Sequence, residues 1–264
     1  MTHRILVVED NPINQKVTIG LLQQAGFVTE LAVDGLEAIQ AFRSKPFDLV
    51  VMDCQMPRCD GWAATRAIRK MEIATNAGRR LPIIALTAQA LTGDREKCIA
   101  SGMDDYLTKP VDRELFIESV RFRLGLTADA PKPASAREAG AEPARESGEL
   151  PLLDHGVIEN LKQYGDATVA QIFGLLLKDL PSLRDRLQHA ITQGDLELTA
   201  KTAHRIKGGC GTVGVAALTR AMDHLERQAR AADLAGIVAA WPANQALISA
   251  SIEAIEPLGK GGAP

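Results

Sequence analysis

The stretch DLVVMDCQMPRCDG (residues 48–61) joins a short apolar run to an aspartate, a loop and the start of a helical pattern. The run at 48–52 is short and almost entirely apolar, which is typical of a strand buried on both faces of a parallel sheet. Asp53 stands where this strand is expected to end, and a helix is expected from Trp62.

The same alternation recurs on both sides of this stretch. Strands are expected at 4–8, 27–31, 48–52, 81–86 and 105–107, and helices at 12–25, 34–42, from 62, at 93–101 and at 112–124. Short apolar strands that alternate with helices are typical of βαβ units. The sequence therefore predicts a doubly wound α/β domain with a five-stranded parallel sheet.

The chain changes character at residues 127–151, which are rich in Ala, Pro, Glu and Gly and nearly lack large apolar side chains. Such a segment cannot bury enough surface to offset the entropy of ordering it, so we expect a flexible linker. Beyond it, helical patterns are predicted at 169–191, 195–213, 215–231 and 236–256. Short polar breaks between them favour an all-α four-helix bundle, with a kink at Pro181.

Composition and charge argue against several classes of protein. The formal net charge is −3, which makes no general case for binding nucleic acid or a membrane surface. No apolar run approaches the ~20 residues that cross a bilayer. The four cysteines form no CxxC pair, which favours unpaired thiols in the reducing cytoplasm.

Polar side chains stand at the expected carboxyl ends of four strands. Glu9 and Asp10 follow the first strand and Asp53 the third, while Thr87 follows the fourth and Lys109 the fifth. In an open parallel sheet these ends form the edge where ligands bind. Three neighbouring carboxylates repel one another and favour a hard divalent cation, which predicts Mg²⁺. A lysine and a hydroxyl beside them suit a site that receives a phosphoryl group.

Each of these residues also has an ordinary structural interpretation. An acidic pair after a strand is often a solvated loop, and a lysine before a proline is usually part of a turn. Thr87 alone would serve as an ST-turn or a helix cap. Only their combination in strand order indicates a phosphoryl site.

A second candidate site lies in AHRIKGGCGTVG (residues 203–214). Lys207 follows His204 by three residues, so both share one helix face and the ammonium can neutralise phosphate oxygens. Gly208 and Gly211 leave bare backbone on that face, at ~1 kcal/mol each against alanine. One interpretation is a phosphoryl-carrying histidine whose glycines clear a docking surface. The other is a helix end with a surface histidine and a glycine C-cap, and spacing alone does not separate them.

Four motifs resemble the receiver domain of two-component response regulators. They are VVEDN (7–11), MDCQMPRCDG (52–61), ALTA (85–88) and MDDYLTKP (103–110). The resemblance covers about residues 3–125 and implies the strand order 2-1-3-4-5.

This resemblance implies roles for individual residues. Asp53 would be the phosphoacceptor, and Lys109 would bind the phosphoryl oxygens. Thr87 and Tyr106 would be the switch pair that reorganises when the phosphate arrives.

It also implies a metal site. Mg²⁺ would be bound directly by Asp10, by Asp53 and by the backbone carbonyl of Gln55. Glu9 would contribute through water, and Gly61 belongs to the loop that shapes the acceptor corner.

The second half resembles histidine phosphotransfer (HPt) domains, in which an AH.LKG pattern is followed by small residues. Ile206 takes the leucine position here. The resemblance implies that His204 is the phosphohistidine, with Lys207 and Gly208 beside it. The predicted domains are a receiver at 1–126, a linker at 127–151 and an HPt bundle at 152–258.

Together the two resemblances imply phosphorelay signalling. Asp53 would accept a phosphoryl group from the phosphohistidine of a sensor histidine kinase. His204 would pass one to or from an aspartate, as in the receiver domain of a downstream response regulator. No segment resembles an ATP-binding kinase lid, so we expect no self-phosphorylation from ATP, whether the chain is free-standing or the C-terminal part of a hybrid kinase.

Two alternatives stay open at this point. The first is a Mg²⁺-dependent phosphohydrolase that forms an aspartyl phosphate, although that chemistry would want a second acid where Gln55 stands. The second is a receiver-gated docking module without a phosphohistidine.

Overall fold

The computed structural model describes residues 2–75, 80–87, 92–109, 111–127, 151–162 and 165–260. The chain divides into two compact units. Apart from its two end residues, the predicted linker at 127–151 lies outside the described residues. The predicted bounds of the linker and of the two domains therefore stay predictions.

The first unit is built on a five-stranded sheet with the strand order β2-β1-β3-β4-β5. Its strands are β1 (Arg4–Val8), β2 (Val28–Ala32), β3 (Leu49–Asp53), β4 (Ile83–Thr87) and β5 (Asp105–Thr108). Every pairing is parallel, which confirms the predicted doubly wound sheet and its order. Val8 lies opposite Met52, and Asp53 lies opposite Leu86. The carboxyl ends of the central strands therefore meet at one edge.

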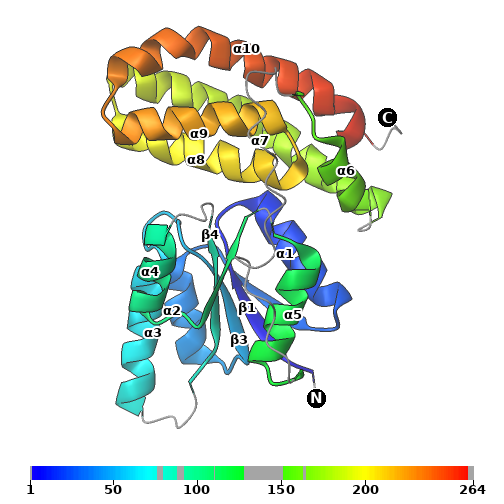
Figure 1. Cartoon of the computed structure of the whole chain (residues 1–264), viewed down its shortest axis with the longest axis vertical. Helices are drawn as coiled ribbons and strands as arrows, with labels where there is room; N and C mark the ends of the chain where they lie inside the picture. The colour runs from blue at the N-terminus through cyan, green and yellow to red at the C-terminus, as the bar shows by residue number, and fades with distance from the viewer. Residues whose placement is uncertain are drawn as a thin grey trace. The chain divides into compact units, whose positions relative to one another are not determined.

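Helices cover both faces of this sheet. They are α1 (Pro12–Gln24), α2 (Gly35–Ser44), α3 (Gly61–Thr75), α4 (Thr92–Ser101) and α5 (Arg113–Arg123). Figure 1 shows α1 and α5 on one face and α2, α3 and α4 on the other. The side chains of Asn11, Asp34 and Asp112 accept backbone N–H groups in the first turns of α1, α2 and α5. These caps fix the residues at which the helices begin.

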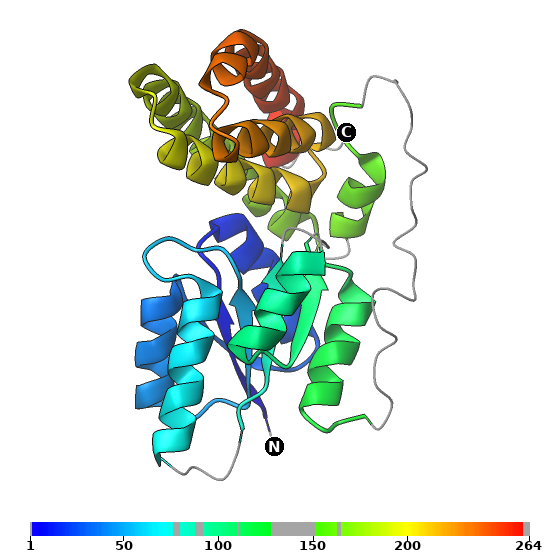
Figure 2. The ribbon, with the colours of Figure 1, turned by 60° about the vertical axis from the view of Figure 1, so that its left-hand side comes forward.

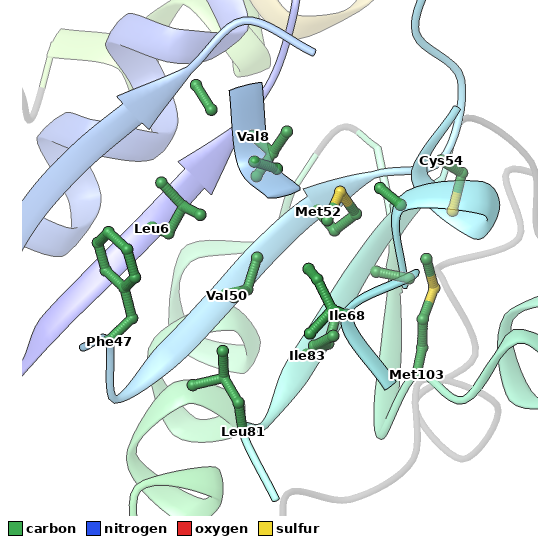
Figure 3. Close-up of a cluster of buried hydrophobic side chains, with 14 of the residues drawn as sticks. Leu6, Val8, Phe47, Val50, Met52, Cys54, Ile68, Leu81, Ile83 and Met103 are labelled. Carbon is green, nitrogen blue, oxygen red and sulfur yellow. The ribbon is translucent and has the colours of Figure 1, made fainter. Parts of the chain in front are cut away.

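The central strands are buried throughout, as a parallel sheet with two covered faces requires. Val50, Met52 and Ile83 pack with Ile68 of α3 in one apolar cluster (Figure 3). Fully burying a side chain of this kind stabilises the fold by about 1.5–3 kcal/mol. This core fixes the strand ends from which the functional residues project.

The second unit is all α. Its helices are α6 (His155–Lys162), α7 (Asp166–Gln193), α8 (Leu196–Val213), α9 (Ala216–Arg230) and α10 (Leu234–Gly259). The four long helices pack as a bundle, which confirms the predicted helical second half. The short α6 packs against α7 and α8 near the C-terminal end of α8 (Figure 2). There the backbone N–H of Asp154 donates to the carbonyl of Gly214 at 2.7 Å.

Two details differ from the sequence expectations. Asp53 and Thr87 are the last residues of β3 and β4 rather than the residues that follow them, because each still pairs with the next strand. Helix α7 contains Pro181 within its bounds, with the buried Leu180 and Leu183 on either side of the missing donor, and the kink expected there stays a prediction. Helix α6 was not expected from the sequence, although Asp154 caps it and Ile158 and Leu161 recur at helical spacing.

Candidate functional site

Three carboxylates meet at the carboxyl edge of the sheet. Asp53 ends β3, while Glu9 and Asp10 directly follow β1. One carboxylate oxygen from each lies within 4.8 Å of the others. Glu9 and Asp53 are buried, and Asp10 is half-buried. Such a set of oxygen ligands could hold a hard metal ion, so the structure brings together the acidic residues that the sequence singled out.

Lys109 lies inside this acidic group. Its Nζ is 2.6 Å from Oε2 of Glu9 and 2.8 Å from Oδ2 of Asp53. Its backbone N–H donates to the carbonyl of Thr87 at 2.7 Å, which ties the end of β5 to the end of β4. Burial alone would lower the pKa of Lys109, but the charges of Asp53 and Glu9 and the hydrogen bonds to them raise it. The lysine is therefore a fixed positive charge at neutral pH.

Glu9 is the most strongly perturbed acid in this group. Burial raises its pKa to about 8 and the charge of Asp53 adds to the rise, while Lys109 opposes it. Oε1 of Glu9 accepts hydrogen bonds from the backbone N–H of Asn11 and from Nδ2 of Asn14, both at 3.1 Å. Burial is the larger cause of this rise, and the repulsion between the carboxylates of Glu9 and Asp53 is the smaller one. A divalent cation would relieve that repulsion.

The loop after Asp53 approaches the acceptor very closely. The backbone N–H of Gln55 donates to Oδ1 of Asp53 at 3.2 Å. The N–H of Gly61 donates to the carbonyl of Cys54 at 3.1 Å, and a Cβ on Gly61 would lie 2.1 Å from the carbonyl oxygen of Asp53. Only glycine fits at that position, because any side chain would collide with the backbone of the acceptor residue.

Thr87 and Tyr106 lie in neighbouring strands. Thr87 is buried at the end of β4, and Tyr106 is half-buried in β5, opposite Ala85. The Tyr106 ring packs against the apolar cluster of Figure 3, and the Arg95 guanidinium carbon lies 5.8 Å from its centroid. The loop at 88–91 lies outside the described residues. The switch role of this pair stays a prediction.

His204 projects from the middle of α8 toward α9. Its Nδ1 lies 3.1 Å from Oε1 of Glu226, and its side chain is 20% exposed. The ring is therefore less open than a fully exposed surface histidine. One edge of the imidazole is held by a carboxylate.

Lys207 shares a face with His204, as the spacing predicts. Its side chain is only 8% exposed. Its Nζ lies 2.6 Å from Oε2 of Glu226 and 3.2 Å from Oδ1 of Asp223. The ammonium is thus bound to carboxylates of α9 rather than left free for a phosphoryl group.

Glu226 is a site residue that the sequence reasoning missed. It is 2% exposed and also pairs with Arg230. Burial alone would raise its pKa, but the hydrogen bonds and charges of His204 and Lys207 lower it to about 2. A signal for it existed, because Glu226 stands four residues after Met222 on the apolar stripe of α9. A charged residue on such a stripe needs a buried partner.

The glycines after His204 play different parts. Gly208 lies inside α8, which continues to Val213, so it is not a C-cap. The C-cap is Gly214, with φ of +81°. A Cβ on Gly211 would lie 3.4 Å from Cγ2 of Thr219, so this half-buried glycine lies against α9. The helix-end interpretation is therefore wrong for Gly208, and the docking role of the two glycines stays a prediction.

Replacing Glu226 with glutamine is expected to destabilise the second unit by about 2–3 kcal/mol at pH 7. The folded pKa of about 2 lies below the unfolded value of 4.5, so the carboxylate stabilises the fold above about pH 4.5. That contribution is lost as the pH falls toward 2. Urea unfolding followed by Trp241 fluorescence in a Trp62→Phe background measures the difference at pH 7 and at pH 3.

The matched control is Glu197→Gln, which removes an exposed carboxylate that pairs with Lys201 on α8. It is expected to change the free energy of unfolding by less than about 1 kcal/mol. Equal losses in the two variants, or a Glu226→Gln loss that does not shrink at low pH, would contradict the buried network.

Among the described helices, none has both the length and the apolar character needed to span a bilayer.

Comparison with known proteins assigns both units. The model of the response regulator receiver domain matches residues 5–121, and the model of the Hpt domain matches residues 171–256. The sensor histidine kinase GacS of Pseudomonas protegens is 36% identical over 228 residues, which cover 84% of this chain and 24% of GacS. The kinase BarA of Shigella flexneri is 29% identical over 231 residues, covering 86% of this chain and 24% of BarA.

A solved structure is also similar to the first unit. The receiver domain of the sensor histidine kinase PA1611 from Pseudomonas aeruginosa, crystallised with magnesium in its active-site cleft, is 44% identical. The match covers 47% of this chain and 99% of that one, with a TM-score of 0.43. The chain spans about a quarter of the length of GacS and BarA. Its two matched regions are a response regulator receiver domain and an Hpt domain, the domains of phosphorelay signalling.

Proposed function

We propose that the chain relays phosphoryl groups through Asp53 and His204. Asp53 accepts a phosphoryl group from the phosphohistidine of a sensor histidine kinase. His204 carries one to or from the aspartate of a receiver domain, such as that of a downstream response regulator. The observation that carries the proposal is the contact of Lys109 with Asp53 at 2.8 Å inside a group of three carboxylates. The partners would meet the chain in the cytoplasm, a reducing compartment in which its four cysteines would stay as thiols.

The transfer at Asp53 needs a nucleophile and charge compensation. A carboxylate oxygen of Asp53 forms a bond to phosphorus while the P–N bond of the donor breaks and the nitrogen keeps the electron pair. Lys109 stabilises the negative charge on the phosphoryl oxygens. The buried hydroxyl of Thr87, at the end of the next strand, is the candidate donor of a further hydrogen bond.

The residues around Asp53 fit a magnesium ion. Asp10, Asp53 and the backbone carbonyl of Gln55 would bind it, and Glu9 would support it through water. When bound, Mg²⁺ supplies positive charge that offsets the repulsion between the carboxylates and the incoming phosphoryl group. The convergence of the three carboxylates within 4.8 Å supports this assignment, and the charge of Asp53 adds to the burial that raises the pKa of Glu9 to about 8.

Asp10→Asn is expected to weaken Mg²⁺ binding by about tenfold or more, because one charged ligand is lost. A Mg²⁺ titration of the full chain, followed by the NMR signals of the Gln55 and Gly61 amides, measures the dissociation constant. Asp112→Asn is the control, since asparagine also caps helices and Asp112 caps α5. Unchanged Mg²⁺ affinity in Asp10→Asn would remove Asp10 from the ligand set.

His204 is arranged for attack through Nε2. With its low pKa, Glu226 is ionised at neutral pH and can only accept a hydrogen bond, so Nδ1 carries the proton. In the neutral tautomer that carries its proton on Nδ1, the lone pair of the ring is on Nε2. That nitrogen bonds to the phosphorus of an aspartyl phosphate as the P–O bond breaks and the carboxylate leaves. Glu226 therefore positions the imidazole, and Gly208 leaves bare backbone one helical turn away.

The chemical lability of the label tests the proposal. The full chain is incubated with a phosphorylated sensor kinase and the bound phosphate is exposed to acid or to base. Phosphohistidine is lost in acid and survives base, and an aspartyl phosphate is lost in base. Both kinds of label are expected. A chain that carries only base-labile phosphate would support the docking-module alternative for the second unit.

A further inference from the structure

The loop between β3 and α3 carries an unusual residue at its tip. Arg58 adopts a φ of +66°, in the left-handed region that residues other than glycine seldom enter. The backbone N–H of Cys59 donates to the carbonyl of Pro57 at 2.7 Å. This i→i+2 hydrogen bond around a residue of positive φ makes a γ-turn of the rarer, strained type. Glycine would adopt the same backbone without that strain.

The Arg58 side chain offers a reason for the strain. Its guanidinium forms an ion pair with the carboxylate of Asp34, which is fully buried, and its Nη2 lies 3.7 Å from Oε1 of Glu37. Asp34 also caps α2, because its Oδ1 accepts the backbone N–H of Glu37 at 2.9 Å. In the part of the chain that the structure describes, Arg58 is the cation paired with this buried carboxylate.

Backbone contacts also join the start of α2 to the tip of the β3–α3 loop. The N–H of Gly35 donates to the carbonyl of Cys59 at 3.1 Å. A Cβ on Gly35 would lie 2.7 Å from that carbonyl oxygen and 2.8 Å from Sγ of Cys59. The start of α2 and the tip of the β3–α3 loop are therefore pressed together, with Arg58 bridging them.

The bridged loop is also the loop that shapes the acceptor site. It begins at Asp53, whose Oδ1 accepts the N–H of Gln55, and it ends at Gly61, which packs against the Asp53 carbonyl. Arg58 is three residues from Gln55 in a loop that is closed by the hydrogen bond between the Gly61 N–H and the Cys54 carbonyl, so the position of the tip constrains the backbone of Gln55.

We propose that the Arg58–Asp34 ion pair is a latch that positions the β3–α3 loop for metal binding beside Asp53. The proposal rests on the proposed function, because it assumes that the site binds Mg²⁺. Arg58 and Asp34 are positioning residues, and neither contacts the metal or the phosphoryl group. The latch explains why a strained arginine stands where glycine would fit more easily.

The test compares Arg58→Gly with Arg80→Ala in the full chain. Both remove an exposed arginine that pairs with an aspartate, but Arg80 pairs with Asp104 elsewhere in the unit. Arg58→Gly is expected to raise the Mg²⁺ dissociation constant by about three- to tenfold, measured by NMR from the Gln55 and Gly61 amides. Arg80→Ala is expected to leave it unchanged.

A second variant keeps the test independent of any folding defect. Asp34→Asn retains the helix cap and removes the charge that Arg58 binds. It is expected to weaken Mg²⁺ binding to the same extent, and the double variant is expected to be no weaker than either single variant, since both remove one interaction. Additive losses, or unchanged Mg²⁺ affinity in both single variants, would overturn the latch.

The outcome for the wild-type chain separates the two proposals. If the wild-type chain binds Mg²⁺ and accepts phosphate while Arg58→Gly binds Mg²⁺ equally well, only the latch is wrong. If the wild-type chain binds no Mg²⁺, the metal site of the proposed function is wrong and the latch is overturned with it.

Discussion

Replacing Asp53 with asparagine is expected to reduce labelling of the receiver by a small phosphodonor, in the presence of Mg²⁺, to background. The amide oxygen is a poor nucleophile, and the substitution also removes one of the carboxylates that would bind the cation directly. The fold is expected to survive, because asparagine has almost the same shape and Lys109 keeps its contact with Glu9 at 2.6 Å. Phosphate incorporation and circular dichroism of the full chain measure the two expectations.

The control for this experiment is Asp48→Asn, at the opposite end of the same strand. Asp48 directly precedes β3, and its Oδ2 accepts the backbone N–H of Arg4 at 2.8 Å. This variant is expected to label normally. Label that persists on the receiver of Asp53→Asn would show that another residue is the acceptor.

The receiver site could be predicted from the sequence because the topology of a parallel sheet determines where such a site lies. Parallel strands bring their carboxyl ends to one edge, so Glu9, Asp53 and Lys109 had to converge once the strands were identified. The rule does not say which of these side chains contact one another. That Lys109 lies against both Glu9 and Asp53, and that the pKa of Glu9 is raised, depends on how the buried side chains pack.

The ion pair between Arg58 and Asp34 could not be predicted from the sequence, for a related reason. Arg58 and Asp34 are far apart in sequence and belong to different connections, so no periodicity links them. Nothing in the residue type indicates a positive φ at Arg58 either, because arginine rarely adopts one. Only the packed backbone brings that conformation and its partner together.

The second unit shows the limit of helical spacing. The spacing placed His204 and Lys207 correctly on one face of α8, because three residues make nearly one turn. It could not say what the face contacts. Glu226 lies 22 residues away in the sequence, on the neighbouring helix, and it binds both residues. The free lysine that the sequence suggested is therefore an internal ion pair, which an arriving phosphoryl group must compete with or rearrange.

The two sites share one electrostatic feature. At each site a lysine with little exposed side-chain surface lies between carboxylates, Lys109 against Glu9 and Asp53, and Lys207 against Glu226 and Asp223. The two lysines differ in the role of the group that they contact. At the first site the lysine contacts the attacking group itself, whereas at the second it contacts the carboxylate that orients the attacking ring. Loss of Lys109 would therefore act on the transfer directly, and loss of Lys207 would act mainly through Glu226.

His204→Gln is expected to remove all base-stable phosphate from the full chain while leaving the base-labile label on Asp53. Glutamine has no ring nitrogen that can attack phosphorus, although its amide can still contact Glu226. His224→Gln is the control, because His224 is an exposed histidine on α9 without the paired lysine and glutamate. It is expected to retain both labels. Base-stable label that survives in His204→Gln and disappears in His224→Gln would show that the phosphohistidine is His224 on α9. Loss of both labels in His204→Gln would mean instead that Asp53 is charged through His204, reversing the direction of flow within the chain.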